Sequence, residues 1–115
     1  MAAGYTIRHR NDAPTVPCPC GDSTRILTAA DAGPCSVHVT RIRDSVKHYH
    51  QRCDEVYYIL HGHGKMELDD EVFDIAPGHV IHIAAGTRHR LVAVDEVTTL
   101  VMAIPAFDPT DEWFD

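Results

Sequence analysis

Three histidines and one glutamate stand at positions where they could hold a metal ion. His48 and His50 alternate along a β-rich run, and because strand side chains alternate between two faces, both imidazoles project to the same side. Glu55 opens the run EVYYIL after the turn-like interval QRCD, so a reversal there brings its carboxylate beside them. His89 follows the turn at 86–88 and adds a third imidazole. We therefore predict a metal site made of these four residues.

The donor atoms limit the identity of the metal. Three nitrogens and one carboxylate oxygen suit Fe, Zn, Mn, Co or Ni, whereas Ca and Mg favour all-oxygen shells. Four protein ligands leave an octahedral ion with open positions, where a substrate or a water molecule can bind. A single histidine on a strand is most simply a surface or hydrogen-bonded residue, but the spacing of the four together argues against that. We expect one divalent transition metal ion, with its identity left open.

Three further side chains are candidates for catalysis. Tyr57 shares a strand face with Glu55, so its hydroxyl could contact a substrate or orient the carboxylate, with core packing as the alternative. His38 and His82 lie in alternating runs whose inward-facing positions the sequence leaves open, and either could be a general base beside the metal. Four arginines could line the mouth of the site and hold a carboxylate, with plain surface charge as the alternative: Arg41, Arg43, Arg88 and Arg90.

The four cysteines offer a weaker signal. Cys18 and Cys20 could bind a second zinc ion with His9 or Cys35, although two thiols one residue apart are an uncommon zinc spacing. We expect reduced thiols that fill small spaces. Cys53 lies between His50 and Glu55 and is either a thiol at the rim of the cavity or an ordinary loop residue.

The elements that must position these residues are short β-strands. Turn formers separate β-rich runs about every ten residues from Arg25 onward, with no helical period, which predicts an all-β sandwich or barrel. Asp69–Asp70 indicates a hairpin turn. The candidate strands are RILT, SVHVTRI, VKHYH, EVYYIL, GKMEL, EVFDI, HVIHIA, HRLVAV and VTTLVMAI.

Length and proline distribution suggest one domain with two terminal segments. A chain of 115 residues is sufficient for a single core. Residues 1–24 are proline-rich with little periodicity and are expected to form an extended arm, 25–107 the barrel, and 108–115 an acidic tail. Trp113 and Phe114 of the tail should pack back onto the barrel or onto a partner subunit.

Charge and hydropathy exclude several classes of partner. With 17 acidic and 10 basic residues, the net charge of -7 repels phosphate backbones and anionic lipids, so we expect no nucleic acid and no membrane partner. No stretch approaches the roughly 18 apolar residues of a membrane span, and the start MAAGYTIRHR lacks the apolar centre of a signal peptide. A cytoplasmic location is the default expectation.

Two segments carry a resemblance to a known family. HYHQRCDEVYYILHG at 48–62 and GHVIHIAAGTRH at 78–89 are similar to the two motifs of the cupin superfamily. The resemblance implies a double-stranded β-helix, or jelly-roll barrel, in which the first motif supplies His48, His50 and Glu55 to the metal and the second supplies His89. It also implies pairing into homodimers through the outer face of a sheet. The whole chain further resembles small single-domain cupins of uncharacterised function.

Four positions depart from the family pattern. Each lies outside the ligand set, so the resemblance leaves metal ligation intact, and the change at Ala93 affects a position where substrate contacts are expected. Ile42 stands where the first motif usually begins with glycine, and the second motif has His79 for aspartate, Ala84 for proline and Ala93 for asparagine.

Fold alone does not decide the chemistry, because the resemblance covers both enzymes and binding proteins. The leading expectation is a metal-dependent enzyme of dioxygenase, isomerase or lyase type, acting on a small polar metabolite. Iron would favour O2 activation, whereas zinc or manganese would favour isomerase or lyase chemistry. The alternative is a non-enzymatic module that binds or senses a sugar or a small acid.

Overall fold

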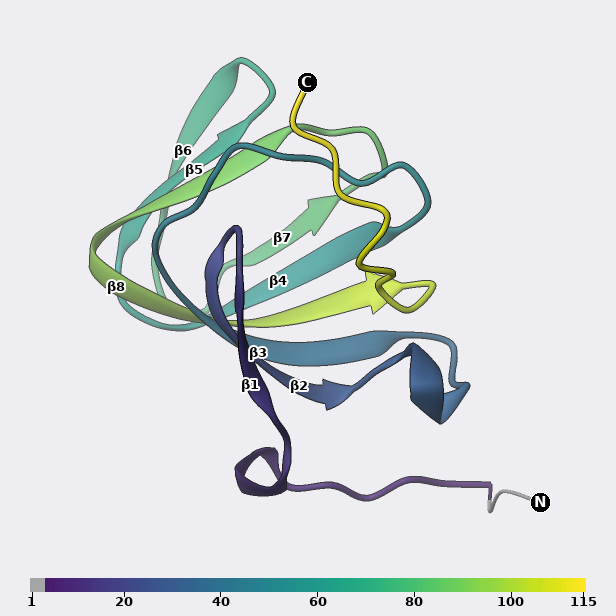
Figure 1. Ribbon diagram of the computed structural model, residues 1–115. Coiled ribbons are helices and arrows are strands. Elements are labelled where there is room, and N and C mark those ends of the chain that lie inside the picture. Colours follow the sequence, from purple (N-terminus) through teal and green to yellow (C-terminus); the bar gives the residue numbers. More distant parts are fainter. Residues whose placement is uncertain (1–3) are drawn as a thin grey trace.

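The computed structural model describes residues 4–115, in which eight strands form the molecule (Figure 1). Over this range there is no α-helix, and no helix is long and apolar enough to cross a membrane. Two short 3-10 turns, Arg10–Asp12 and Ala29–Asp31, lie near the N-terminal strands. The strands are β1 (Thr15–Cys18), β2 (Gly21–Leu27), β3 (Ser36–Asp44), β4 (Asp54–His61), β5 (Gly64–Leu68), β6 (Glu71–Ile75), β7 (Val80–Ile83) and β8 (His89–Ile104).

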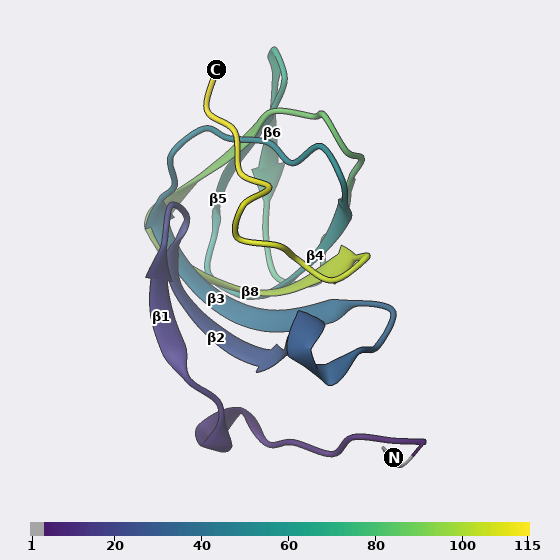
Figure 2. The same cartoon turned by 45° about the vertical axis from the view of Figure 1, so that its right-hand side comes forward.

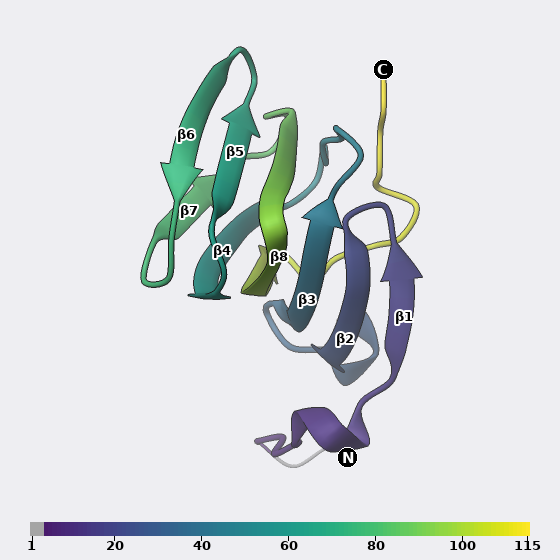
Figure 3. The same cartoon turned by 90° about the vertical axis from the view of Figure 1, so that its left-hand side faces the viewer.

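The long strand β8 joins the two sides of the barrel. Its second half pairs with β3 and β4, giving the order β1-β2-β3-β8-β4-β7 that Figure 3 shows side by side, while its first half pairs with β5, which pairs with β6. All of these pairs are antiparallel. Figure 2 looks into the resulting ring of strands. The predicted all-β jelly-roll barrel is confirmed.

The interior of the barrel has an apolar half and a polar half. Alternation along β4, β5 and β8 turns Ile59, Met66 and Leu91 into a tightly packed apolar cluster. On β2 and most of β3 the inward positions are instead occupied by polar residues, of which Ser23, Ser36, His38 and Thr40 are buried, whereas Ile42 near the end of β3 belongs to the apolar cluster. The metal-ligand candidates therefore adjoin polar groups on one side and packed hydrocarbon on the other.

The N-terminal segment differs from the extended arm expected over 1–24. Thr15–Cys18 and Gly21–Leu27 form a hairpin that pairs with β3, so the expectation of a loop is wrong for these residues. Pro17 is tolerated because β1 is an edge strand, where a missing N–H leaves no ladder bond unmade. Residues 1–3 of the expected arm lie outside the described residues. The boundaries of arm, barrel and tail stay a prediction.

Two further expectations about elements are corrected. The run VKHYH is no strand: only isolated bridges pair His48 with His89 and Tyr49 with Trp113, because the chain here crosses the end of the barrel instead of running along a neighbour. The runs HRLVAV and VTTLVMAI are one continuous strand, β8. The Asp69–Asp70 turn does join β5 and β6, as expected.

The C-terminal tail packs back onto the barrel's own residues. Tyr49 and Trp113 exchange two backbone hydrogen bonds of 3.0 Å each. The carboxylate of Asp111, which is 1% exposed, accepts hydrogen bonds from the backbone N–H groups of Gln51 and Arg52 at 2.9 Å each and from Trp113 Nε1 at 3.0 Å. The tail thus fixes the loop that carries His50.

Candidate metal centre

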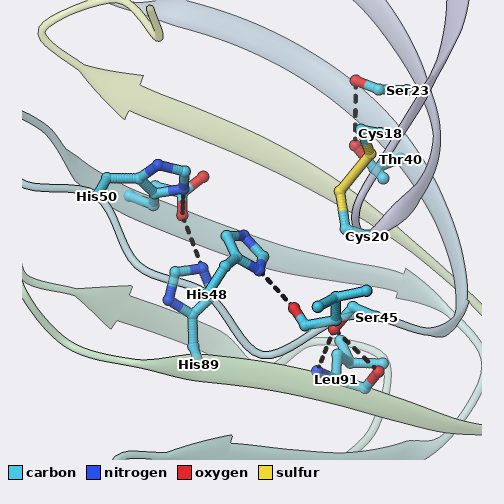
Figure 4. The surroundings of a disulfide bond; sticks show 11 residues. Cys18, Cys20, Ser23, Thr40, Ser45, His48, His50, His89 and Leu91 are labelled. Carbon is cyan, nitrogen blue, oxygen red and sulfur yellow. Dashed lines mark hydrogen bonds and ion pairs between the residues drawn. A yellow bond between two sulfur atoms is a disulfide. The ribbon is translucent and has the colours of Figure 1, made fainter. Parts of the chain in front are cut away.

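The four predicted ligands come together at one end of the barrel. His48 and His89 form an antiparallel bridge through backbone hydrogen bonds of 3.1 and 2.8 Å, which sets their imidazoles side by side. His50 follows two residues later, and Glu55 is the second residue of β4. All four residues are buried. Figure 4 shows the three imidazoles gathered together, across from the N-terminal hairpin.

Each of the three imidazoles is held in the same tautomer. The Nδ1 atoms of His48, His50 and His89 lie 2.6, 2.6 and 2.9 Å from the carbonyl oxygens of Val46, Asp111 and Thr87. A carbonyl oxygen only accepts, so each Nδ1 carries a hydrogen and donates it. A neutral ring held in this way presents an unprotonated Nε2, which is the form that binds a metal.

The carboxylate of Glu55 completes the cluster. Its Oε1 lies 3.1 Å from Nε2 of His50 and 3.1 Å from Nε2 of His89. Despite that approach, neither Glu55 Oε1 nor His89 Nε2 has a hydrogen-bond partner of suitable geometry among residues 4–115. Buried polar atoms without hydrogen-bond partners are rare and costly, and these two atoms lie next to each other.

The electrostatics of the cluster favour unprotonated Nε2 on His48 and a charged Glu55. Burial, reinforced by the charge of His89, lowers the pKa of His48 to about 4. Burial alone would raise the pKa of Glu55, but the short contacts and charges of His50 and His89 outweigh it and hold that pKa well below its usual range. Burial likewise lowers the pKa of His50, but the contact with Glu55 outweighs it and raises the pKa to about 9.

These residues fit a transition metal ion. Ligands at about 2.1 Å that occupy adjacent corners of an octahedron stand about 3 Å apart, close to the separation between Glu55 Oε1 and its two imidazole neighbours. Candidate ligand atoms of the three histidines all lie within 4.8 Å of one another. A bound cation would also satisfy the two unpartnered atoms. The donor set of nitrogens with one carboxylate suits Fe, Zn, Mn or Ni.

A second group of metal-binding residue types, His50, Cys53 and Asp111, is not a comparable site. The Asp111 carboxylate already accepts three hydrogen bonds. Burial, together with the neighbouring carboxylates, raises the pKa of the Cys53 thiol to about 12, so it is not a thiolate at neutral pH. The group instead supports His50, because the ring's Nδ1 donates to the Asp111 carbonyl.

Two of the three catalytic candidates lie at the site and one does not. His38 and Tyr57 line the same small cavity as His48 and Glu55. His82 lies on the opposite, outer face of β7, where its Nε2 contacts Asp54 at 3.0 Å. The expectation that His82 stands beside the metal is therefore corrected: the pairing of β7 with β4 turns its neighbour Ile83 inward.

The arginines expected at the mouth of the site lie elsewhere. Arg41, Arg43 and Arg90 pair with carboxylates on the outer surface. Arg88 stacks over the ring of Tyr49, with 4.2 Å from Cζ to the ring centroid, and donates to the carbonyl of Asp115. Surface charge, the alternative reading, holds for this group.

The cysteines also differ from expectation. Cys18 and Cys20 are joined in a disulfide at the turn of the N-terminal hairpin (Figure 4), so they are not the reduced thiols we expected and do not offer a pair of thiolates to a second zinc. Cys35 and Cys53 are free thiols. Cys53 is 5% exposed and does not line the cavity.

The cavity beside the ligands also contains residues that we had not predicted as part of the site. It measures about 30 Å³, enough for a water molecule or two, and it includes Arg25 of β2 with Phe107 and Glu112 from the C-terminal segment. Burial raises the pKa of Glu112. Alternation along β2 could have placed Arg25 inward with Ser23, but only the register with β3 sets it opposite His38. Nothing in the sequence indicated that the tail returns to this end.

Comparisons with known proteins agree with this picture. The profile of the family described as "Cupin domain" matches residues 38–105. L-ectoine synthase of Halomonas elongata is 36% identical over 74 residues, covering 61% of this chain and 54% of that protein, and acireductone dioxygenase of Exiguobacterium sibiricum is 35% identical over 72 residues, covering 58% and 39%. The chain spans about half the length or less of the curated relatives it matches.

A solved structure matches over nearly the whole chain. The crystal structure of a protein from Planctomyces limnophilus superposes with a TM-score of 0.90 at 32% identity, covering 97% of this chain and 98% of that one. The N-terminal hairpin and the tail therefore recur in a relative of the same length.

Proposed function

The chain belongs to the cupin family, and from that premise we propose that it is a metal-dependent enzyme acting on a small polar molecule. His48, His50, Glu55 and His89 would hold one divalent transition metal ion. The observation that carries the proposal is the cluster of three imidazoles, each held through Nδ1, with a buried carboxylate beside two of them and two of the facing atoms left unpartnered. The ion would supply Lewis-acid chemistry, or O2 activation in the case of iron.

The chain's own residues around the cavity are suited to moving protons. Burial, aided by the nearby charge of Arg25, lowers the pKa of His38 to about 4, so the ring is neutral at pH 7 and would be a weak base, able to take a proton from a ligand that the bound ion acidifies. Burial and then the charge of Glu55 raise the pKa of Tyr57, which keeps its hydrogen and can donate it to a ligand oxygen. Glu112, whose pKa burial raises, adds a carboxyl group at the same cavity.

This combination favours a proton-transfer reaction of isomerase or lyase type. Acid and base groups flank the place where a ligand would meet the metal ligands, and water is limited by the small volume of the cavity. An oxygenase reaction is the second candidate, supported by the local similarity to acireductone dioxygenase over the barrel. A module that binds or senses a sugar or small acid without turnover is the third.

Metal content and turnover test the proposal. Protein purified without added metal should contain close to one equivalent of a transition metal by elemental analysis. His50→Ala should lose that metal while keeping the wild-type circular dichroism spectrum, and His63→Ala, at an exposed turn position, should retain it. Wild-type protein without metal, which also takes up no added Co²⁺, would overturn the proposal.

Oxygen consumption separates the two kinds of reaction. Pools of small carbonyl, hydroxy and carboxylic acid compounds should be consumed at the same rate with and without O2 if proton transfer is correct. Substrate-linked O2 uptake by an iron-loaded sample would assign the oxygenase reaction instead. Saturable binding without consumption under either condition would favour the binding module.

We further propose a homodimer that covers an outer sheet face. Tyr58 and Val80 are paired across β4 and β7 and are 44% and 63% exposed. Light scattering coupled to size exclusion should give twice the mass of the chain, and Tyr58→Lys should shift it toward one chain. If the wild-type protein has the mass of a single chain, the proposed homodimer is wrong. The cytoplasmic location stays a prediction.

A further inference from the structure

Arg25 carries a charge into the cavity but forms no ion pair there. On β2 it lies opposite His38 of β3 and shares the inward side with Ser23. Among residues 4–115 it forms no ion pair, and its Nε is buried without a hydrogen-bond partner. Five other arginines do pair with carboxylates in that range: Arg8, Arg41, Arg43, Arg52 and Arg90.

An unpartnered buried N–H is costly, because the Nε atom of Arg25 has lost its contact with water without gaining a hydrogen-bond acceptor. Arginine stays charged at every pH at which proteins fold, so the cost is not relieved by loss of a proton. Packing holds the group in place: Arg25 Cζ lies 5.6 Å from the centroid of the Phe107 ring, a cation–π arrangement. The guanidinium is thus held in position with an N–H group that lacks a hydrogen-bond acceptor.

The position of Arg25 indicates which acceptor. It lines the same cavity as His48 and Glu55, so a ligand held by Arg25 at one end meets the metal-ligand cluster at the other. Nδ1 of His48 and the carboxylate of Glu55 offer nothing to an anion directly, whereas a guanidinium fork matches a carboxylate with two parallel hydrogen bonds. The cavity of about 30 Å³ suits only a ligand end of a few atoms.

We propose that Arg25 binds the carboxylate of a small carboxylic acid whose other end faces the metal centre, and that Arg25 therefore determines specificity. This proposal rests on the proposed function for one part only, the position of the reacting end of the acid at the metal centre. Binding of the carboxylate by Arg25 does not depend on it. Glu112 lies in the same cavity as a competing carboxyl group, and because burial raises its pKa it more readily becomes neutral when an acid enters.

Nuclear magnetic resonance of the Arg25 Nε–H group tests this directly, with acetate as the probe and acetamide as its neutral counterpart of equal size. The signal is identified by its loss in Arg25→Gln. In wild-type protein, acetate should shift it saturably and acetamide should not. Arg25→Gln should weaken acetate binding at least tenfold, followed on the backbone amide of His38, because a charge-assisted bond pair is lost.

Arg41→Gln is the matched control, since Arg41 lies on the neighbouring strand but pairs with Asp22 on the surface. It should bind acetate within twofold of wild type. Equal shifts with acetate and acetamide in wild-type protein would overturn the proposal even if Arg25→Gln did not fold, as would unchanged acetate affinity in a folded Arg25→Gln. Metal content of the same samples keeps the two proposals apart: acetate binding by protein that contains no metal and takes up no added Co²⁺ refutes the metal-dependent function alone.

Discussion

A backbone carbonyl beside each histidine fixes what that side chain can do. Val46, Thr87 and Asp111 each accept a hydrogen from an Nδ1, and this leaves the Nε2 atom of each ring as the one available to a metal; those of His50 and His89 face the Glu55 carboxylate. Two of these carbonyls lie two residues before the histidine they orient, so the local chain conformation sets the tautomer. The third comes from the tail, so His50 depends on a distant segment.

The buried His38 should make stability sensitive to acid. Its pKa is about 4 in the folded chain and near 6.5 when unfolded, so between these pH values the unfolded state binds more protons. Its contribution to stability is fully present above pH 6.5 and is lost as the pH falls toward 4. We expect His38→Gln to reduce the slope of unfolding free energy against pH by up to one proton in that window. Urea unfolding of metal-free protein at several pH values measures it, and an unchanged slope would contradict the burial of a neutral ring.

The two free thiols should react at very different rates. Cys53 is buried and has its pKa raised to about 12, whereas Cys35 is partly exposed. At pH 8 a disulfide reagent should label one thiol of the native protein at least tenfold faster than the other. Cys35→Ser should remove the fast phase and Cys53→Ser should leave it. Rapid labelling of folded Cys35→Ser would show that Cys53 is accessible.

Among the elements, the tail acts as a support for the loop that carries His50. Asp111→Ala leaves the N–H groups of Gln51, Arg52 and Trp113 without their acceptor, and we expect a loss of about 3 kcal/mol in unfolding free energy with weaker metal binding. Asp108→Ala removes an exposed pairing with Arg52 and should cost less than about 1 kcal/mol. Denaturant unfolding and metal titration of both variants decide the point. Equal effects would mean that Asp111 has no special role.

The glycine that ends the first motif is required by close approach as well as by backbone conformation. Gly62 has φ +88°, and a Cβ there would clash with the carbonyl oxygen of Glu96. Gly78 has φ +95° with nothing nearby, so it isolates the cost of the backbone conformation alone. Gly78→Ala should lose about 1 kcal/mol and Gly62→Ala clearly more, above about 2 kcal/mol. Thermal unfolding of the two variants measures which loss of stability is larger. A larger loss in Gly78→Ala would contradict the clash inferred at Gly62.

The sequence predicted what depends on local spacing. His48, His50 and His89 lie together, and Glu55 contacts two of them, because alternation and turn residues are recognised within a few positions; that these four residues hold a metal stays a prediction. One departure from the motif is also explained locally: His79, in place of aspartate, accepts the backbone N–H of Ala76 at 2.9 Å through Nδ1 and keeps the turn closed.

What the sequence did not predict depends on long-range pairing. The prolines of the β1–β2 hairpin made this segment look like a loop, and its disulfide was not expected. The segment is recognised as a strand pair only by its register with β3. Asp111 meets Gln51 across 60 residues of chain, and the direction of His82 was left open because its side of β7 is set by pairing with β4. No local pattern carries that information.

At the scale of the whole molecule, the proposed metal should act as a stabilising ligand. An ion that binds only the folded chain adds about 3 kcal/mol at a hundredfold excess over its dissociation constant. Removal by a chelator should therefore lower the melting temperature by roughly 10 °C or more, and re-addition should restore it. Calorimetry of wild type and His50→Ala provides the measurement. A chelator effect of the same size in His50→Ala would place the stabilising ion elsewhere.

The division of the barrel interior has an evolutionary consequence. The apolar cluster centred on β4, β5 and β8 holds the sheets together, while polar side chains of β2 and β3, with the tail, line the small cavity beside the metal-ligand candidates. Under the proposed function, substitutions at Ser23, Ser36 or Thr40 would alter which molecule fits without removing the packing on which folding depends. One half of the interior would then be free to change its substrate during evolution, while the other half and the metal-ligand candidates between them stay the same.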